Sequence, residues 1–454
     1  MQQNFETSLF IFRRDLRLED NTGLIFALKH SKAVIAAFIF TDEQIKHNPY
    51  RSDRSLRFML ESLEDLRTKI EEKGGKLFFF EGKPDEVVDK CISSIGVEAV
   101  VFNKDYTPYS RKRDSSIEHV CKKYKIPCYS FDDALLHAPE ETLKKDGTPY
   151  TVFTPYFRNA SKIEVALPAP NKYTNYFSAK IPFAHDSSPL SCLDNELPLN
   201  TLKGGRAEAI SLLSKLSSLE EYSTLRDFPE KQFSSHLSPY LKFTICSPRE
   251  VHLAICKKLG PHHDLIRSLY WRDFFTTIAF FFPHVFTGAF HQKFDALNWS
   301  YDKQAFARWC EGTTGFPIVD AGMRELNSTG IMHNRVRMIV ASFLTKDLRI
   351  DWRWGERYFA QKLLDYDPSL NNGNWQWAAS TGCDAQPYFR IFNPWSQQQK
   401  FDPDCVYIKQ WIPELRELSS KTIHNLEEEK GNYPAPMVCH ATESRKTLSM
   451  YKAI

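Results

Sequence analysis

Residues 33–40 read Ala-Val-Ile-Ala-Ala-Phe-Ile-Phe, an unbroken run of eight apolar residues. A short apolar run that contains β-branched and aromatic residues is typical of a strand buried on both faces of a parallel sheet. Four similar runs occupy residues 8–12, 76–80, 99–103 and 126–131. We therefore expect the first 131 residues to contain a parallel β-sheet.

The segments between these runs have the spacing of amphipathic helices. Helical candidates cover residues 52–73, 84–94 and 110–123. In the first of them Leu56, Leu60, Leu63, Leu66 and Ile70 fall on one face. The alternation of strands and helices predicts an α/β domain with a doubly wound parallel sheet. No Gly-x-Gly-x-x-Gly follows the first run, so the usual dinucleotide fingerprint is missing.

The rest of the chain has two further compositions. Residues 132–199 are rich in Pro, Ser, Asn and Lys without sustained periodicity, which indicates a long interdomain connector. From residue 200 onward the pattern is helical, with candidates at 206–216, 248–259, 264–282, 303–312, 318–328, 336–346 and 352–364. We predict an α/β domain over 1–131, a connector over 132–199 and an all-α domain over 200–454.

Composition narrows the class of protein. The 454 residues have a formal net charge of only +3, so overall charge does not indicate nucleic acid. The ten Cys include no Cys-x-x-Cys pair, which favours reduced thiols over a disulfide framework or a zinc site. No stretch reaches the roughly 18 apolar residues of a membrane span, and the N-terminus has no signal-peptide pattern. We expect a soluble cytoplasmic protein.

Four polar or aromatic clusters are candidates for a binding site. Residues 233–239, Phe-Ser-Ser-His-Leu-Ser-Pro, place three hydroxyls before a predicted helix start. Such hydroxyls can bind a phosphate group or simply cap the helix. Residues 365–377 combine two carboxylates, several amides and two indoles, which suits the hydroxyls and ring edge of a cofactor or a polar loop that closes a helix. Residues 331–338 place Arg335 and Arg337 among apolar residues. Arginines in such a position bind a phosphate or form a structural ion pair with a carboxylate. Trp271 and Arg272 suit the stacking of a base, or a core Trp beside a surface Arg.

Together these clusters resemble the photolyase/cryptochrome family, and most closely its class I cyclobutane pyrimidine dimer photolyases. The similarity covers nearly the whole chain, in motifs at residues 12–21, 314–321, 326–330, 332–335, 371–380 and 390–394. The resemblance implies an α/β domain that binds an antenna chromophore, a connector, and a helical domain that holds FAD. It assigns FAD binding to Tyr222, Ser234, Ser235, His236, Leu237, Ser238, Arg337, Asp365, Asp367 and Asn371.

The resemblance also gives individual roles to some of these residues. Arg337 is expected to pair with Asp365 beside the isoalloxazine, and Asn371 matches the position beside flavin N5. An amide there favours neutral or reduced flavin, whereas a carboxylate marks plant-type cryptochromes and a Cys animal ones. Trp375, Trp352 and Trp299 match a chain of three tryptophans that carries electrons from the surface to oxidised FAD. Asn371 therefore favours repair.

The implied reaction is light-driven repair of DNA, a lyase activity in which the cofactor does the chemistry. Photoexcited FADH⁻ gives one electron to a pyrimidine dimer under blue light, the cyclobutane bonds break, and the electron returns. Photolyases are among the enzymes known to extrude their target bases from the duplex. The resemblance assigns substrate or DNA contacts to Arg226, Ser268, Trp271, Arg272, Asn334, Arg335, Met338, Trp377, Arg390 and Gln397.

Four positions differ from the pattern of particular members of the family. Ser268 stands where these photolyases usually carry a Glu that contacts a dimer base, which predicts a lower repair yield. Asn334 stands where (6-4) photolyases carry a second His, which argues against (6-4) repair. Tyr109 and Ser110 replace the Asn-Glu of folate-binding members, so methenyltetrahydrofolate is disfavoured as the antenna, and a deazaflavin, a second flavin or an empty site stay open.

Two other classes share part of this pattern. A cryptochrome acting as a blue-light receptor has the same fold, FAD and tryptophans, but its signalling members usually have C-terminal extensions, and here eighteen residues follow Pro436. A plain nucleotide-binding electron-transfer protein gives no reason for Trp271 and Trp377. We therefore expect a DNA repair enzyme that acts as a monomer on damaged DNA with a flipped dimer, with no membrane, metal or obligate protein partner.

Overall fold

The computed structural model describes residues 4–45, 48–185, 200–231, 233–426 and 431–454. The chain divides into two compact units. The first unit comprises Met1–Ser218 and Ser235–Pro283, and the second comprises Leu219–Ser234 and His284–Ile454. The predicted domain boundaries after residues 131 and 199 stay a prediction, and the connector's residues 186–199 lie outside the described residues.

The first unit is built on one five-stranded sheet. The strands are β1 (Phe5–Phe12), β2 (Ser31–Phe40), β3 (Leu77–Glu81), β4 (Ala99–Asn103) and β5 (Cys128–Phe131). They lie in the order β3-β2-β1-β4-β5, and every pair is parallel. This confirms the predicted doubly wound sheet, because the order reverses direction at β1 and so places crossovers on both faces.

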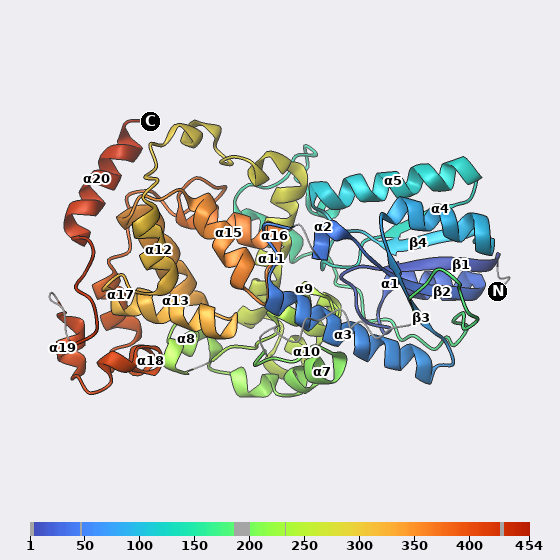
Figure 1. The fold of residues 1–454 in the computed structure, drawn as a ribbon, viewed down its shortest axis with the longest axis horizontal. Coiled ribbons are helices and arrows are strands. Elements are labelled where there is room, and N and C mark those ends of the chain that lie inside the picture. Colours follow the sequence, from blue (N-terminus) through green and yellow to red (C-terminus); the bar gives the residue numbers. More distant parts are fainter. Residues whose placement is uncertain (1–3, 46–47, 186–199, 232, 427–430) are drawn as a thin grey trace. The chain divides into compact units, whose positions relative to one another are not determined.

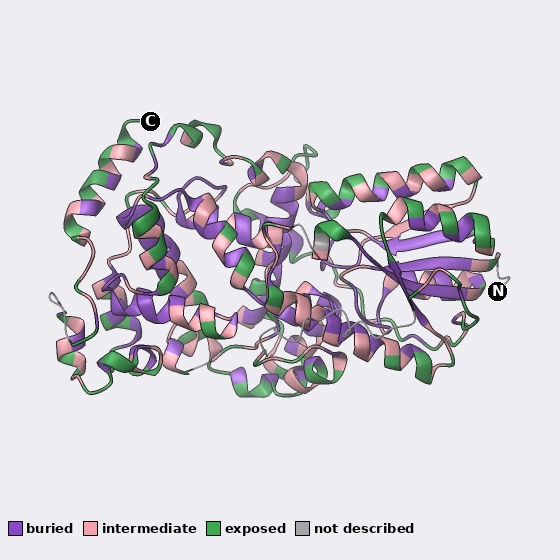
Figure 2. Cartoon of the chain, in the orientation of Figure 1, coloured by how far each residue is buried: buried purple, intermediate pink, exposed green. Residues whose placement is uncertain are grey.

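Helices cover the two faces of this sheet. The helices are α1 (Thr22–His30), the short α2 (Asp42–Ile45), α3 (Asp53–Glu72), α4 (Pro84–Ile95) and α5 (Pro108–Tyr124). Helices α4 and α5 pack together along one face, and α3 runs along the other (Figure 1). Strands β2, β3 and β4 are almost wholly buried and β5 is half-buried, whereas α4 and α5 expose their outer sides (Figure 2).

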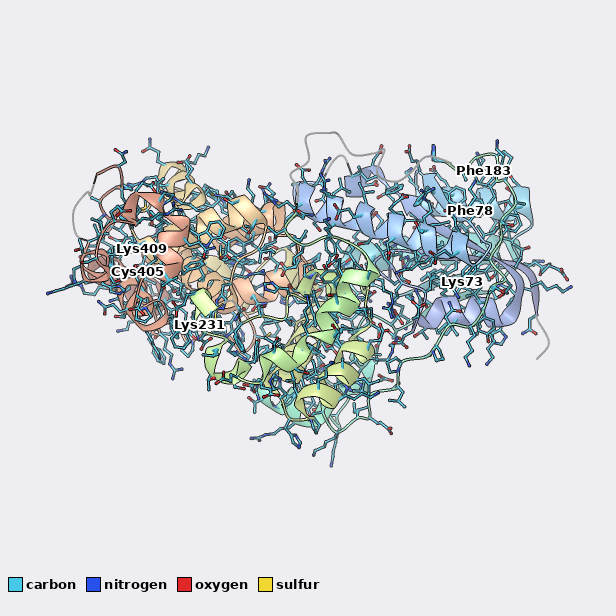
Figure 3. The ribbon with its side chains drawn as sticks, turned by 90° about the horizontal axis from the view of Figure 1, so that it is seen from below. Lys73, Phe78, Phe183, Lys231, Cys405 and Lys409 are labelled. Atoms are coloured by element: carbon cyan, nitrogen blue, oxygen red, sulfur yellow. The ribbon has the colours of Figure 1, made fainter. Side chains whose placement is uncertain are left out.

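Parts of the predicted connector pack onto this unit. The residues that follow β5 include η1 (Pro139–Thr142) and α6 (Phe153–Ala160). Tyr176 forms a parallel bridge with Val34 of β2. Phe183 packs against the apolar cluster that contains Phe78 of β3 (Figure 3). These segments are short and irregular, so apolar periodicity could not reveal them.

The first unit also contains a second set of helices, α7 (Arg206–Ser214), α9 (Ser238–Lys242), α10 (Pro248–Leu259) and α11 (Asp264–Phe281). A buried ionic network joins α10 and the carbonyl of Thr244 to the segments that follow β1 and β5. Arg17 donates to Asp133 at 2.6 Å and to the Thr244 carbonyl at 3.0 Å, and Arg249 of α10 donates to the same Asp133 at 2.8 Å. Burial alone would raise the pKa of Asp133, but Arg17 and Arg249 lower it to about 2. The motif at residues 12–21 therefore supplies part of the framework of this unit.

In its described residues the second unit is mostly helical, and Ser300 and Ile350 form an isolated parallel bridge. Its helices are α8 (Tyr222–Leu225), η4 (Pro229–Lys231), η5 (Pro283–Phe286), η6 (Gln292–Ala296), α12 (Lys303–Glu311), α13 (Pro317–Thr329), α14 (Asn334–Ser342), the π-helix η7 (Phe343–Asp347), α15 (Trp352–Lys362), α16 (Pro368–Ala378), α17 (Pro394–Phe401), α18 (Val406–Trp411), η8 (Pro413–Leu415), α19 (Ser420–His424) and α20 (His440–Lys452). Between the two units, η3 spans Leu216–Leu219.

Helix α13 is central to the second unit, because it packs against α12, α14, α17 and α18. One apolar cluster fills this unit and includes Trp299, Trp309, Trp352 and Trp375. Among the helices of the described residues, we find none with the length and apolar character needed to cross a membrane.

Candidate active site

Residues 368–377 of the polar cluster lie on helix α16, and Asp365, Tyr366 and Asp367 precede it. Asp367 caps the helix, because its Oδ1 accepts hydrogen bonds from the backbone N–H groups of Ser369 at 3.0 Å and Leu370 at 3.2 Å. Pro368 occupies the first helical position, where its missing N–H is not needed. The carboxylate expected at the ribose thus also holds the start of the helix.

The helical period divides the amides of α16 between two faces. Asn372 and Gln376 lie one turn apart and both donate to the carbonyl of Val285, at 2.9 and 3.1 Å. Gln376 also accepts from the backbone N–H of Phe290 at 2.7 Å. These two amides hold the 285–290 segment in place. The sequence alone did not distinguish this structural role from contact with the ring edge of a cofactor.

Asn371 lies on the other face and is fixed by α15. Its Nδ2 donates to the backbone carbonyl of Glu356 at 2.9 Å and to Glu356 Oε1 at 3.0 Å. Burial raises the pKa of Glu356 to about 7, although the hydrogen bond from Asn371 and the charge of Arg357 lower it. The sequence did not single out Glu356, because only the packing of α15 on α16 brings it to Asn371.

Arg337 and Asp365 form the predicted ion pair. Arg337 Nη2 lies 3.2 Å from Oδ1 and 3.0 Å from Oδ2 of Asp365, and its Nε donates to the Met332 carbonyl at 2.9 Å. The side chain of Asp365 is 10% exposed, so its charge is matched inside the unit before any ligand binds. The pair offers a fixed charge and hydrogen-bonding groups beside α16.

Trp375 packs deep in the same face as Asn371. Its ring centroid lies 4.9 Å from that of Phe359 and 6.1 Å from that of Trp309, both in edge-on geometry. Gly355 makes this possible, since a Cβ on Gly355 would lie 2.2 Å from Trp375 Cη2. Neither Gly355 nor Trp309 was predicted, because both depend on contacts between helices.

The two other predicted electron carriers share this apolar cluster. Trp352 is 2% and Trp299 is 5% exposed. The Arg353 guanidinium lies 5.1 Å from the centroid of Trp352, and Tyr451 of α20 lies 6.4 Å from Trp299. All three tryptophans are therefore held in one rigid core, while their role as an electron chain stays a prediction.

Several predicted DNA contacts lie at or near the surface of the second unit. Asn334 and Arg390 are exposed, and Met338, Trp377 and Gln397 are half-buried. Asn334 Nδ2 lies 3.9 Å from Met338 Sδ one turn along α14. These positions are compatible with the predicted contacts.

Two arginines have protein partners in the second unit. Arg335 donates to Asp227 at 2.7 Å and lies 4.3 Å from the Phe401 ring centroid. Arg226 lies 5.4 Å from the ring centroid of Tyr222. A phosphate contact from Arg335 would therefore compete with the carboxylate of Asp227.

The first unit holds the remaining predicted residues. Trp271 stacks on Phe153 with ring centroids 3.6 Å apart and planes within 6°, and Ser268 is exposed one turn before it on α11. Arg272 is 7% exposed and donates to the Leu241 carbonyl at 3.3 Å. Its guanidinium thus has a partner within this unit, and its contact with DNA stays a prediction.

The predicted phosphate segment is divided between the units, with Ser234 in the second and residues 235–238 in the first. In the first, Ser235 Oγ accepts from the backbone N–H of Leu237 at 3.4 Å, and His236 has a positive φ of 52°. Leu237 is buried, and Ser238 begins α9. A hydroxyl and a strained backbone are thus present where phosphate binding is expected.

The residues of the second unit fit a flavin. No described residue donates to Asn371 Oδ1, so this oxygen can accept a hydrogen bond from the ring edge of a ligand. In the same unit, Arg337 adds a hydrogen-bond donor and Asp365 adds an acceptor. Among the described residues, no cluster of three or more His, Cys, Asp or Glu has the arrangement of a metal site.

The family models that match this chain agree with a site that binds a flavin. Residues 8–171 match the family model described as DNA photolyase, and residues 265–453 match the FAD binding domain of DNA photolyase. The fold and the site therefore define a flavoprotein with an α/β part and a helical FAD-binding part.

Relatives of known name match over almost the full length. The deoxyribodipyrimidine photo-lyase of Alkalihalophilus pseudofirmus is 38% identical, over 97% of this chain and 97% of its own. The photolyase of Sulfolobus tokodaii, solved with two FAD molecules, is 41% identical with a TM-score of 0.89 over 99% of this chain and all of its own. The chain belongs to the DNA photolyase family.

A cryptochrome structure is also similar. The Synechocystis cryptochrome is 27% identical, with a TM-score of 0.89, over 98% of this chain and 99% of its own. The shared fold alone thus does not separate repair from light sensing, whereas the full-length relatives named deoxyribodipyrimidine photo-lyase support repair.

Proposed function

We propose that the protein is a light-driven lyase that repairs cyclobutane pyrimidine dimers in DNA with FAD as cofactor. The observation that carries this proposal is the amide of Asn371 on α16. Its nitrogen donates to the backbone and side chain of Glu356 on α15, and no described donor occupies its carbonyl oxygen. The 38% identity to a deoxyribodipyrimidine photo-lyase along the full chain supports it. The chemistry supplied by bound, reduced FAD is light-driven donation of one electron to the dimer, with its return after the cyclobutane bonds break.

The protein's own residues bind and orient the cofactor. We assign Arg337, Asp365 and Asn371 to the flavin, Asp367 to the ribose side, and Tyr222 with residues 234–238 to the phosphates. Arg337 orients Asp365, because a guanidinium holds a carboxylate through directional charge-assisted hydrogen bonds. Asn371 presents an acceptor to a ring N–H and so favours a flavin that carries a proton there.

Trp375, Trp352 and Trp299 are assigned to the delivery of electrons to oxidised FAD. Their burial supports this role, because an indole with few solvent contacts has little reorganisation around it and a fixed position. Replacing Trp375 with Phe should slow photoreduction and leave repair by enzyme that was reduced beforehand intact. Loss of both activities would contradict the assigned role.

Damaged DNA is the proposed partner. Trp271 and Trp377 are assigned to the two sides of a flipped dimer, Ser268, Asn334 and Met338 to its cavity, and Arg226, Arg335, Arg390 and Gln397 to the DNA backbone. The stack of Phe153 on Trp271 supports a rigid platform for a base. We further infer that the enzyme acts as a cytoplasmic monomer and that residues 1–131 accept an antenna, for which a deazaflavin, methenyltetrahydrofolate and a second flavin are the candidates.

Repair of a dimer-containing oligonucleotide under blue light, with a dark control, tests this function. We expect loss of the lesion only in the light and only with FAD bound. Photoreduction of FAD without any repair would support the cryptochrome alternative, and light-independent loss of the lesion would refute both. A protein that binds no FAD would refute the whole assignment.

A further inference from the structure

Glu356 is a buried carboxyl that contacts the residue assigned to the flavin edge. It lies on α15, its residue is 6% exposed, and its side chain accepts from Asn371 Nδ2 at 3.0 Å. A carboxyl in such a place is costly unless it has a purpose or a partner, since burial disfavours its charged form. Its only described hydrogen-bond donor is Asn371.

The contacts of Asn371 determine which way its amide faces. The backbone carbonyl of Glu356 can only accept a hydrogen bond, so the atom 2.9 Å from it must be the amide nitrogen. The second amide hydrogen goes to Glu356 Oε1. With both hydrogens used, Asn371 offers only its carbonyl oxygen to a ligand.

Charges near Glu356 are few in the described part of the chain. Arg357 is its neighbour on α15, and α16, which packs against it, carries no titratable side chain. In η7, which also packs on α15, Lys346 donates to Ser380 and Asp347 pairs with His440. Arg337 of α14 pairs with Asp365. The carboxyl of Glu356 thus has no paired cation, and burial raises its pKa to about 7.

We propose that Glu356 is a positioning residue that fixes the Asn371 amide with its oxygen toward the flavin, and that it takes up a proton when the flavin gains negative charge. This inference rests on the proposed function. A charge added near a buried carboxylate favours its protonation, and linkage requires that protonation in turn favours the added charge. One residue therefore controls both the orientation of the amide and the response of the cofactor to pH.

Two substitutions separate these two parts of the proposal. Glu356→Gln keeps an oxygen that can accept from Asn371 but removes the titration. Glu356→Ala removes the side-chain acceptor and leaves only the backbone carbonyl. Asp347→Asn is the matched control, because Asp347 is also buried with a pKa raised to about 6, but its partner is His440 and not Asn371.

The experiment measures the midpoint potential of bound FAD between pH 6 and 8.5 and the rate of its photoreduction. We expect the potential of the wild type and of Asp347→Asn to fall more steeply with pH near 7 than that of Glu356→Gln. Glu356→Ala should slow photoreduction roughly fivefold to tenfold, the equivalent of one hydrogen bond to a polar group, and Glu356→Gln should restore most of the rate. Equal pH dependence in wild type and Glu356→Gln would overturn the proposal.

An infrared measurement gives a readout that does not need activity. With ¹³C-labelled Glu, the carboxyl band of a protonated side chain should titrate near pH 7 in the apoprotein, and Glu356→Gln should lack that band. Its persistence in Glu356→Gln would overturn the inference. The FAD content of each preparation separates the two hypotheses, because a wild type without FAD refutes the proposed function, whereas a repairing wild type with these negative results refutes only the role of Glu356.

Discussion

Replacing Gly355 with Ala should disturb Trp375 in a predictable way. The new Cβ would lie 2.2 Å from Trp375 Cη2 and 2.5 Å from Leu344 Cδ2. Carbon atoms prefer separations of about 3.5–4.0 Å, so the indole must move by more than about 1 Å or α15 must shift. Inserting a methylene into a packed core costs about 1–3 kcal/mol, whereas Gly→Ala in a helix gains only roughly 0.5–1 kcal/mol. We expect a net loss of stability of about 1–2 kcal/mol.

A double-mutant cycle tests whether Trp375 is the cause. Trp375→Phe removes the part of the indole that the new methyl meets, so the double variant should be more stable than the sum of the single effects by more than about 0.5 kcal/mol. Gly322→Ala is the matched control, because its Cβ would lie 2.3 Å from Val336 Cγ1 and meets no atom of Trp375. Its effect should add to that of Trp375→Phe within about 0.3–0.5 kcal/mol.

Urea unfolding followed by circular dichroism, at saturating FAD for every variant, supplies the four free energies of unfolding. Additive effects for Gly355→Ala and Trp375→Phe would refute the packing argument. A Gly355→Ala variant as stable as the wild type would do the same, since the clash would then be relieved without cost.

Three further predictions concern the ion pairs and the predicted lesion cavity. Arg337→Ala should weaken FAD binding, measured by fluorescence titration, about tenfold or more, because a hydrogen bond to a charged group is worth about 1.5–3 kcal/mol. Arg324→Ala is the control: it removes the hydrogen bond of 2.8 Å from Arg324 Nη1 to Glu414 Oε2 and should leave FAD binding unchanged. Asp133 has a pKa of about 2, below its ordinary value. Its contribution of roughly 2 kcal/mol to the free energy of unfolding is therefore complete above about pH 4 and is lost as the pH falls through 2. Acid unfolding of Asp133→Asn should show a flatter dependence on pH over that range, and an unchanged slope would contradict the ionic network. Ser268→Glu should raise the yield of repair per absorbed photon, and a yield equal to or below that of the wild type would show that a carboxylate at this position does not assist.

The sheet could be predicted from the sequence because most of its strands are largely buried. Each strand then appears as a continuous apolar run, and all five runs correspond to strands β1 to β5. Helix α1 was missed, although Asn21 caps it by accepting from Leu24 N–H, because the helix is only nine residues long. Short helices whose stability comes from tertiary packing have too few turns to show a period.

Helix α16 shows a different limit of sequence analysis. Asn and Gly are poor helix formers, so no helix was predicted over the run Asn-Asn-Gly-Asn. The signal that could have corrected this was the pair Asp367-Pro368, a capping residue followed by the residue most suited to the first helical position. Local propensity lost to the cap and to the burial of Asn371, Asn372 and Trp375.

The supporting residues of the site could not be predicted, because they become neighbours of the site only through helix packing. Gly355 and Glu356 are consecutive on α15, and Asn371 and Trp375 are one turn apart on α16. Gly355 gives the indole its place, and Glu356 holds the amide. A single turn of α15 thus sets both the hydrogen bond that Asn371 is proposed to offer to the flavin and the position of Trp375, one of the proposed electron carriers. A shift of α15 at Gly355 must therefore also move Glu356, so the Gly355→Ala variant should alter the pH dependence of the flavin potential as well as the packing of Trp375.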